Sequence, residues 1–227
     1  MQALVLCGGL GTRLSSLLGD RPKPMATVAG RPFLEYLLLQ LRQQDFVDVI
    51  LCTGHQGKYI EEYFDCGERW GIHLRYSQEQ ERLGTAGAIR LAVHLVEGDD
   101  FCVFNGDSFF DADLPRLNRY HEEKGALATI ALAHKENSQR YGSVVINASG
   151  EIKGFFEKTE EQAGWINGGI YVFDREIANY IPPGQAVSLE QEIFPNLIGQ
   201  RFYGLPFPSS YLVDIGTPKD YLRLVLP

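Results

Sequence analysis

Short apolar runs alternate with amphipathic segments through the first half of the chain. Apolar runs of this length are typical of buried strands, and the amphipathic segments between them are typical of helices. The strand-like runs cover residues 3–7, 48–53, 73–77 and 101–105, and the helix-like segments cover residues 33–43, 59–64 and 86–96. This alternation predicts a doubly wound, mostly parallel, Rossmann-like α/β sheet flanked by helices, whose ligands bind beyond the carboxyl ends of the strands.

The alternation of strands and helices ends after a predicted helix over residues 114–124. Closely spaced strands are expected at residues 128–133, 143–146, 152–156 and 170–173, with turn residues at 147–150. A helix at 189–197, strands near 202–205 and 211–214, and a last helix from Pro218 complete the pattern. We therefore predict a single domain over residues 1–227, in which a core at 1–125 is followed by an added mixed β region at 126–227.

Composition narrows the class of protein. A hydrophobic content of 44% with 22% charged residues is typical of a soluble globular chain, and the apolar runs are too short to cross a membrane. The N-terminus lacks the positive flank and cleavage site of a signal peptide, so we expect a cytoplasmic protein. The four cysteines show no paired spacing, which argues against both a disulfide framework and a zinc site.

The formal net charge of −8 argues against nucleic acid as a partner, because nucleic-acid-binding proteins usually carry a basic face. An anionic small ligand would need cations concentrated at its site. Such cations accompany a glycine-rich segment near the N-terminus.

Three glycines, Gly8, Gly9 and Gly11, directly follow the first predicted strand. Without side chains, their backbone N–H groups are accessible to a phosphate or a base. Arg13 lies within the same segment, and the two prolines around Lys23 favour an extended backbone that presents its ammonium group toward the loop. Arg13 and Lys23 therefore supply charge suited to a triphosphate.

A dinucleotide-binding loop and a Walker loop are the rival interpretations of this segment. The dinucleotide motif requires a third glycine where Leu14 stands, and an acidic residue where the second strand ends in Cys52-Thr53. The Walker motif requires a Gly-Lys-Ser/Thr sequence that the loop lacks. An isolated Gly-Gly-x-Gly is equally typical of a simple tight turn.

Two aspartates follow predicted strands. Asp107 follows the strand at 101–105, and Asp214 ends the short strand that precedes the last helix. Mg²⁺ prefers one or two carboxylates together with phosphate oxygens and water, so Asp107 is a candidate ligand. Either aspartate alone is also typical of a turn or a helix N-cap, and Asp113, before Leu114-Pro115, is expected to be an N-cap.

The segment Gly8-Gly9-Leu10-Gly11-Thr12-Arg13-Leu14, followed by Pro22-Lys23-Pro24, resembles the sugar-phosphate nucleotidylyltransferases. A second match is the Asp-x-Gly-Thr-Pro segment that begins at Asp214. The resemblance implies transfer of a nucleotide from a nucleoside triphosphate to a sugar 1-phosphate. It also implies catalytic roles for Arg13, Lys23, Asp107 and Asp214, with Mg²⁺ held by Asp107 and Asp214.

The same resemblance implies two sets of binding residues. The nucleotide contacts are Leu6, Gly8, Gly9, Gly11, Thr12, Glu79, Gly84 and Thr85. The sugar-phosphate contacts are Asn105, Gly142, Glu157, Lys158, Asn167 and Gly168. Glu79 precedes a Leu-Gly-Thr-Ala-Gly segment, and its carboxylate suits the N1–H and exocyclic amine of guanine, although the N3–H of uracil or thymine would satisfy it in part.

Two details favour one branch of the family. The segment after Arg13-Leu14 lacks a proline that many members carry, and Phe109-Phe110 follows Asp107. Both features resemble the D-glycero-α-D-manno-heptose 1-phosphate guanylyltransferases, which use GTP. The alternatives are a mannose 1-phosphate guanylyltransferase, a uridylyltransferase for another sugar 1-phosphate, a glycosyltransferase with a similar fold, and a non-catalytic nucleotide-sugar sensor. A homodimer is a further expectation.

Overall fold

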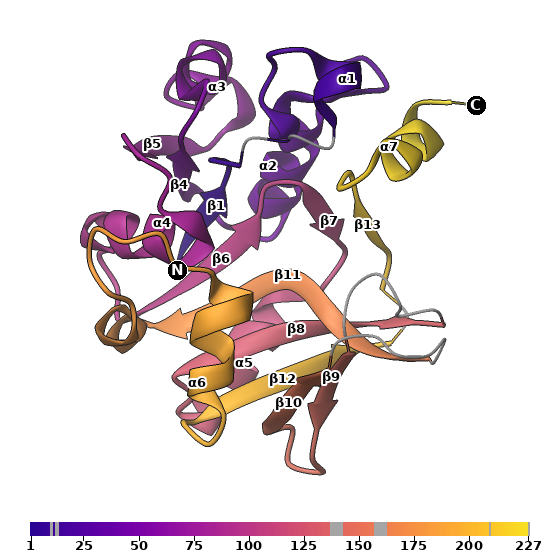
Figure 1. The fold of residues 1–227 in the computed structure, drawn as a ribbon. Coiled ribbons are helices and arrows are strands. Elements are labelled where there is room, and N and C mark those ends of the chain that lie inside the picture. The colour runs from indigo at the N-terminus through magenta and orange to yellow at the C-terminus, as the bar shows by residue number, and fades with distance from the viewer. Residues whose placement is uncertain (10, 12–13, 137–142, 157–162, 209, 227) are drawn as a thin grey trace.

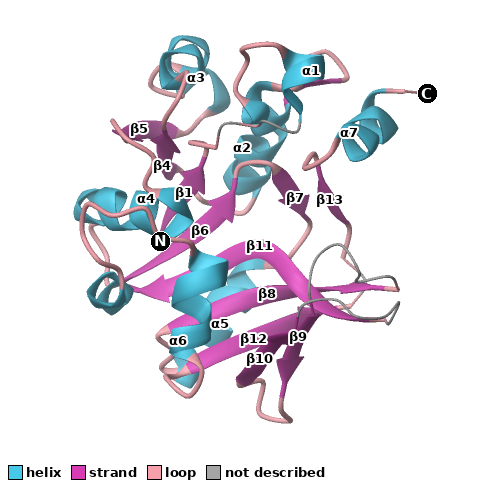
Figure 2. Cartoon of the chain, in the orientation of Figure 1, coloured by secondary structure: helices cyan, strands magenta, loops and turns pink. Residues whose placement is uncertain are grey.

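The structure is a computed structural model that describes residues 1–9, 11, 14–136, 143–156, 163–208 and 210–226. Its centre is a seven-stranded sheet in the order β12-β8-β11-β6-β1-β4-β5 (Figures 1 and 2). The strands are β1 (Gln2–Leu6), β4 (Asp48–Thr53), β5 (His73–Gln78), β6 (Asp100–Asn105), β8 (Ala128–Lys135), β11 (Gly164–Asp174) and β12 (Phe202–Phe207). Only β11 runs antiparallel to its neighbours in this sheet, which confirms the prediction of a mostly parallel mixed sheet.

The central strands are buried on both faces. Along β1, Ala3, Leu4 and Val5 are fully buried, and alternate side chains contribute to two separate core clusters. Ala3 and Val5 belong to one cluster and Leu4 to the other. A continuous apolar run is what a parallel strand covered on both faces requires, which is why the first strand could be predicted from its sequence.

Helices cover both faces of the sheet (Figure 1). One face is packed by α2 (Phe33–Gln43) and α5 (Leu114–Lys124), and the other by α4 (Gly84–Ala92), a π-helical turn η6 (Leu189–Ile193) and α6 (Phe194–Leu197). The remaining helices are α1 (Ser15–Leu18), α3 (Gly57–Phe64) and α7 (Pro218–Val225). Short 3₁₀ turns are η2 (Lys23–Met25), η3 (Glu68–Trp70), η4 (Val93–Leu95) and η5 (Arg175–Tyr180).

The described residues also form three two-stranded ribbons outside the central sheet. They are β2 (Thr27–Val28) with β3 (Arg31–Pro32), β9 (Ser143–Ile146) with β10 (Ile152–Phe156), and β7 (Ser108–Phe110) with β13 (Leu212–Asp214). The hairpin between β9 and β10 turns at residues 147–150, as the sequence predicts. In the β7–β13 ribbon Asp214 lies opposite Ser108, so the C-terminal part of the chain returns to the carboxyl end of β6.

Several boundaries differ from the sequence-based prediction. The strand expected at 170–173 begins at Gly164 and continues through a bulge at Gly168-Gly169, because its pairing with β8 resumes beyond these two glycines. The helix expected at 189–197 opens with a π-helical turn before it becomes α-helical. Asp113 is the N-cap of α5, as expected, and accepts the N–H of Arg116. Among the described residues, no helix is long and apolar enough to cross a membrane.

Candidate active site

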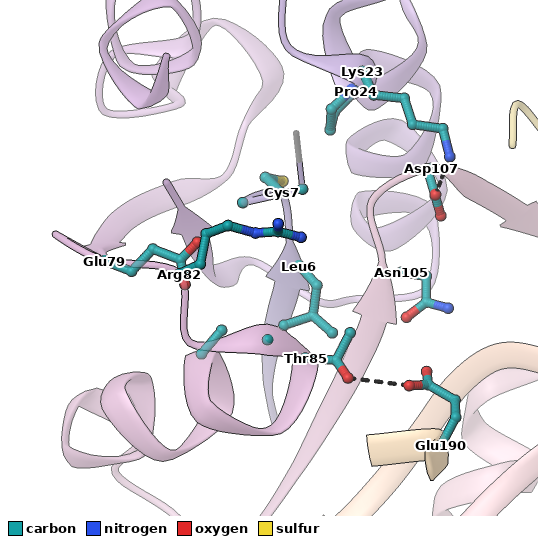
Figure 3. A pocket seen from close by; sticks show the side chains of 14 residues that line it. Leu6, Cys7, Lys23, Pro24, Glu79, Arg82, Thr85, Asn105, Asp107 and Glu190 are labelled. Atoms are coloured by element: carbon teal, nitrogen blue, oxygen red, sulfur yellow. Dashed lines mark hydrogen bonds and ion pairs between the residues drawn. The ribbon is translucent and has the colours of Figure 1, made fainter. Parts of the chain in front are cut away.

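A cavity of about 420 Å³ opens at the carboxyl ends of β1 and β6, beside the N-terminus of α4 (Figure 3). Nine of the sequence-predicted residues line it: Leu6, Gly8, Gly9, Lys23, Glu79, Gly84, Thr85, Asn105 and Asp107. These residues come from four separate segments of the chain, at residues 6–9, 23, 79–85 and 105–107. The sheet topology places them together, because parallel strands end at a common edge.

A second, smaller cavity of about 220 Å³ adjoins the first. It shares Lys23, Asn105 and Asp107 with the larger cavity. Its other walls include Asn167, Gly168 and Asp214, three further residues that the sequence predicts. The two cavities therefore meet at the three shared side chains, and each is large enough to accommodate part of a ligand.

Lys23 and Asp107 form an ion pair at this junction (Figure 3). The Lys23 side chain is 13% exposed, whereas the Asp107 side chain is 38% exposed. Pro22 is extended, as expected, but Lys23 begins the 3₁₀ turn η2 instead of continuing the extended backbone that the two prolines predict. Its ammonium group nevertheless reaches Asp107, which follows β6. The ammonium is therefore fixed at the site, while the carboxylate retains access to the cavity.

Asp214 reaches the same place from the other end of the chain. Its Oδ1 atom accepts the N–H of Gly216 at 2.8 Å. A Cβ on Gly216 would lie 2.6 Å from that oxygen and 3.9 Å from Lys23 Nζ, so the carboxylate and the ammonium both lie close to this glycine. Asp107 and Asp214 thus line one cavity.

The side chains at this junction can be compared with the ligands that a metal ion requires. Among the described residues, no three His, Cys, Asp or Glu side chains are grouped as a protein-only metal centre. Two carboxylates in one cavity nevertheless fit Mg²⁺, which completes its octahedron with phosphate oxygens and water. Asp107 and Asp214 are the side chains that would hold it.

Glu79 lies at the opposite side of the larger cavity (Figure 3). Its Oε2 atom accepts the N–H of Leu83 at 3.0 Å. Its Oε1 atom lies between two glycines, because a Cβ on Gly8 or Gly54 would be only 2.8 or 2.5 Å from it. Burial raises the pKa of the Glu79 carboxyl, and the Leu83 hydrogen bond and the charge of Arg82 act in the opposite direction. A side chain at position 8 would therefore clash with this carboxylate, and glycine leaves room for it.

The bulge in β11 directs Asn167 into the smaller cavity. Asn167 Nδ2 donates to the hydroxyl of the buried Tyr171 at 2.9 Å, and its Oδ1 accepts the N–H of Gly169. Asn105 lies beside them, since a Cβ on Gly169 would be 3.0 Å from Asn105 Nδ2. Asn105 Oδ1 is buried and has no hydrogen-bond partner within the described part of the chain. A buried acceptor of this kind is suited to a substrate hydroxyl.

Glu190 is a cavity residue that the sequence reasoning did not identify. Thr85 Oγ1 donates to Glu190 Oε2 at 3.1 Å and accepts the N–H of Leu189 at 2.8 Å. Ser188 Oγ also donates to Glu190 Oε2, at 3.0 Å. These contacts fix one oxygen of the carboxylate at the cavity wall (Figure 3).

A close approach of two segments brings Glu190 into the site. A Cβ on Gly84 would lie 2.5 Å from the carbonyl oxygen of Val187, and one on Gly87 would lie 2.7 Å from that of Gln185. Gly84 also has a φ of +69°. The only sequence signal for this contact is the spacing of these glycines. Arg82 is another lining residue that was missed, and its side chain extends into the cavity (Figure 3).

Some predicted residues are not brought to a cavity wall. Gly11 lines neither cavity. Its φ is +59°, and a Cβ at this position would lie 3.1 Å from Lys23 Cβ. The glycine therefore lets the loop pass close to the lysine. Phe110 is fully buried in the core against Phe207 and Gly168. Five predicted residues lie outside the described part of the chain: Thr12, Arg13, Gly142, Glu157 and Lys158.

The sequence pattern of the nucleotidyl transferase family matches residues 2–226, and the chain belongs to this family. Members of the family generally use a divalent metal ion.

Three relatives refine the comparison. D-glycero-alpha-D-manno-heptose 1-phosphate guanylyltransferase of Campylobacter jejuni is 39% identical over 226 residues, which cover 100% of this chain and 99% of the relative. Mannose-1-phosphate guanylyltransferase of Mycobacterium tuberculosis is 37% identical, over 98% of this chain and 63% of the relative. The crystal structure of HddC from Yersinia pseudotuberculosis complexed with GMP-PN matches with a TM-score of 0.86 and 30% identity, over 98% of this chain and 97% of that one.

Proposed function

We propose that the protein transfers GMP from GTP to D-glycero-α-D-manno-heptose 1-phosphate, giving GDP-heptose and pyrophosphate. The observation that carries this proposal is the junction of two cavities at Lys23, Asn105 and Asp107. Two substrates bound in adjoining cavities would present their phosphates to each other at this junction. The heptose and the guanine base are supported by the relatives that match the chain over nearly its whole length.

The chemistry requires alignment and neutralisation of charge. An oxygen of the sugar 1-phosphate attacks the α-phosphorus of GTP, and the bond from that phosphorus to the bridging oxygen of pyrophosphate breaks. The attacking phosphate monoester is already ionised near neutral pH, because its second pKa is about 6. We therefore assign no general base and no covalent intermediate.

Lys23 is assigned to the phosphates of GTP, where its fixed ammonium offsets negative charge on the transferring group. Arg13 is assigned to the same triphosphate and Lys158 to the phosphate of the sugar, on the basis of the motifs that contain them. Asp107 and Asp214 would hold Mg²⁺. When bound, this ion would neutralise charge on the phosphate oxygens.

Glu79 is assigned to the base. With Oε2 bound to the Leu83 N–H, the carboxylate retains lone pairs for the N1–H and amino group of guanine, and Gly8, Gly9, Gly84 and Thr85 line the same space. Asn105 and Asn167 are assigned to sugar hydroxyls in the smaller cavity. Glu190 lines the larger cavity and is assigned to a ribose hydroxyl of GTP, because one of its oxygens is held by Thr85 and Ser188 at that wall.

We also propose that the two parts of this single domain have different roles. Apart from the contact of Glu190, residues 1–125 bind the nucleotide, and residues 126–227 supply sugar contacts and the second metal ligand. All four cysteines are free thiols, which suits a reducing cytoplasm where GTP is available. A homodimer remains a prediction, to be checked by light scattering.

A panel of four nucleoside triphosphates against heptose, mannose, glucose and N-acetylhexosamine 1-phosphates tests the proposal. Pyrophosphate release is expected to be fastest with GTP and the heptose substrate. A preference for mannose 1-phosphate would replace the heptose assignment, as the Mycobacterium relative illustrates. Release with no pair of substrates would overturn the transferase itself.

A further inference from the structure

A third cavity, of about 470 Å³, lies away from the two described above and shares no lining residue with either. It is formed by the start of α2, the end of α3 and the η3 turn, which lie at the same end of the molecule (Figure 1). Arg31, Glu35, Tyr63, Arg69 and Trp70 are its polar and aromatic walls. Its volume falls within the usual range for small-molecule sites, about 300–1,000 Å³.

Glu35 organises one side of this cavity. The residue is 5% exposed, and both of its carboxylate oxygens are used. Arg31 Nη1 donates to Oε1 at 3.2 Å, and the Tyr63 hydroxyl donates to Oε2 at 3.1 Å. A buried carboxylate with two donors holds both partners in place. The Arg31 side chain remains 57% exposed, so the rest of its guanidinium faces the opening.

Arg69 is the second cation that lines this cavity. Its guanidinium lies over the Trp70 ring, with Cζ 5.2 Å from the ring centroid. Trp70 is itself held by Phe64 and Tyr63, whose ring centroids are 4.9 and 5.9 Å away. Within the described residues Arg69 forms no ion pair and no hydrogen bond through its side chain. Its five N–H donors are therefore available to a ligand while stacking restricts their position.

We propose that this cavity binds the phosphate group of a small molecule through Arg69 and Arg31. Guanidinium groups match phosphate oxygens bidentately, and two of them lining one cavity can bind one phosphate together. Glu35 balances only one of the two positive charges. An uncompensated cation in a preformed cavity is notable because the chain carries a net charge of −8.

Trp70 supplies a local probe of binding. The chain contains two tryptophans, and the other, Trp165, packs against His134 on the far part of the sheet. In a Trp165→Phe background, fluorescence therefore reports on the cavity. Inorganic phosphate and a sugar 1-phosphate, titrated at constant ionic strength, are each expected to give a saturable change with a Kd in the millimolar range or tighter. A response to the sugar phosphate alone would assign the site to phosphorylated sugars, and a response to both would assign it to phosphate itself.

Arg69→Gln is expected to weaken the phosphate response at least tenfold, and Arg69→Lys to weaken it less. Arg116→Gln is the matched control, because Arg116 also stacks on an aromatic ring, with Cζ 5.1 Å from the Phe207 centroid. This control is expected to retain the response, and turnover of Arg69→Gln is expected to be unchanged. The proposal is overturned by the absence of a saturable change, by equal responses in Arg69→Gln and the parent, or by an acetate response equal to that of phosphate.

Discussion

Lys23 and Asp107 are paired across 84 positions of sequence, at the point where the larger and the smaller cavity meet. The lysine, in the η2 turn, is the more buried partner, and Asp107, two residues beyond the end of β6, is the more exposed one. Each partner is assigned a separate task in the transfer reaction. Substituting each one in turn should separate these tasks.

Replacing Lys23 by methionine should have opposite effects on metal binding and on catalysis. Without the ammonium, Asp107 loses its ion-pair partner and should bind Mg²⁺ more tightly in the absence of nucleotide. The rate of transfer should nevertheless fall by about 10²-fold or more, because a fixed charge near the reacting phosphates is lost. Isothermal titration with Mg²⁺ and steady-state kinetics measure the two effects. Weaker Mg²⁺ binding in this variant would argue against Asp107 as a ligand.

Asp107→Asn should reduce turnover severely while the fold is retained. The side chain is 38% exposed and is not part of the core, so the melting temperature should change little. We expect kcat to fall by about 10²–10³-fold and the Mg²⁺ dependence to weaken. Asp111→Asn is the control, since Asp111 is an exposed residue in the following loop that lines neither cavity. Normal Mg²⁺-dependent rates in Asp107→Asn would contradict the catalytic role assigned to Asp107.

Glu79→Gln should reduce kcat/KM for GTP by about 10-fold to 100-fold, because a neutral amide offers one acceptor where guanine needs two. The variant should also discriminate less between GTP and ITP, which lacks the exocyclic amine. Glu81→Gln, an exposed neighbour outside the cavity lining, should leave both values unchanged. Equal discrimination in the two variants would remove Glu79 from the base site.

The same carboxylate predicts a pH dependence. Burial raises the pKa of Glu79, so the group takes up its proton at a higher pH than an exposed glutamate does. The ionised form accepts the guanine donors, and KM for GTP should therefore begin to rise earlier as the pH falls. Glu79→Gln should lack this acidic limb. A KM profile of identical shape in the variant would assign the limb to another group.

Glu190→Gln should raise KM for GTP about tenfold, with less than a twofold change in KM for the sugar 1-phosphate, if the free oxygen of Glu190 binds a ribose hydroxyl in the larger cavity. Glu192→Gln is matched to it on the same π-helical turn, where Glu192 Oε1 accepts the N–H of Ser188. That control should lower the melting temperature slightly and leave both KM values in place. A selective rise in KM for the sugar 1-phosphate in Glu190→Gln would reassign the residue to the sugar.

Much of the fold could be predicted from local sequence. The bounds of α2 and α5 coincide with the predicted segments, because amphipathic periodicity and clear ends define both helices. α5 starts at the Asp113 N-cap and ends at Gly125, which has a φ of +51°. β11 was predicted too short, since Gly168-Gly169 resembles a turn when it is considered without the β8 ladder that continues past it.

The sequence by itself determined the family, the position of the glycine-rich loop and the two strand-end aspartates, because each depends on residue types at fixed spacing in one segment. Tertiary structure decided which segments meet. Glu190 joins the site only because Gly84 and Gly87 let residues 185–187 dock against α4, and Thr85 then holds the carboxylate. Such a contact depends on the distance of closest approach between two backbones that are about a hundred positions apart, a quantity that no local pattern of residues encodes.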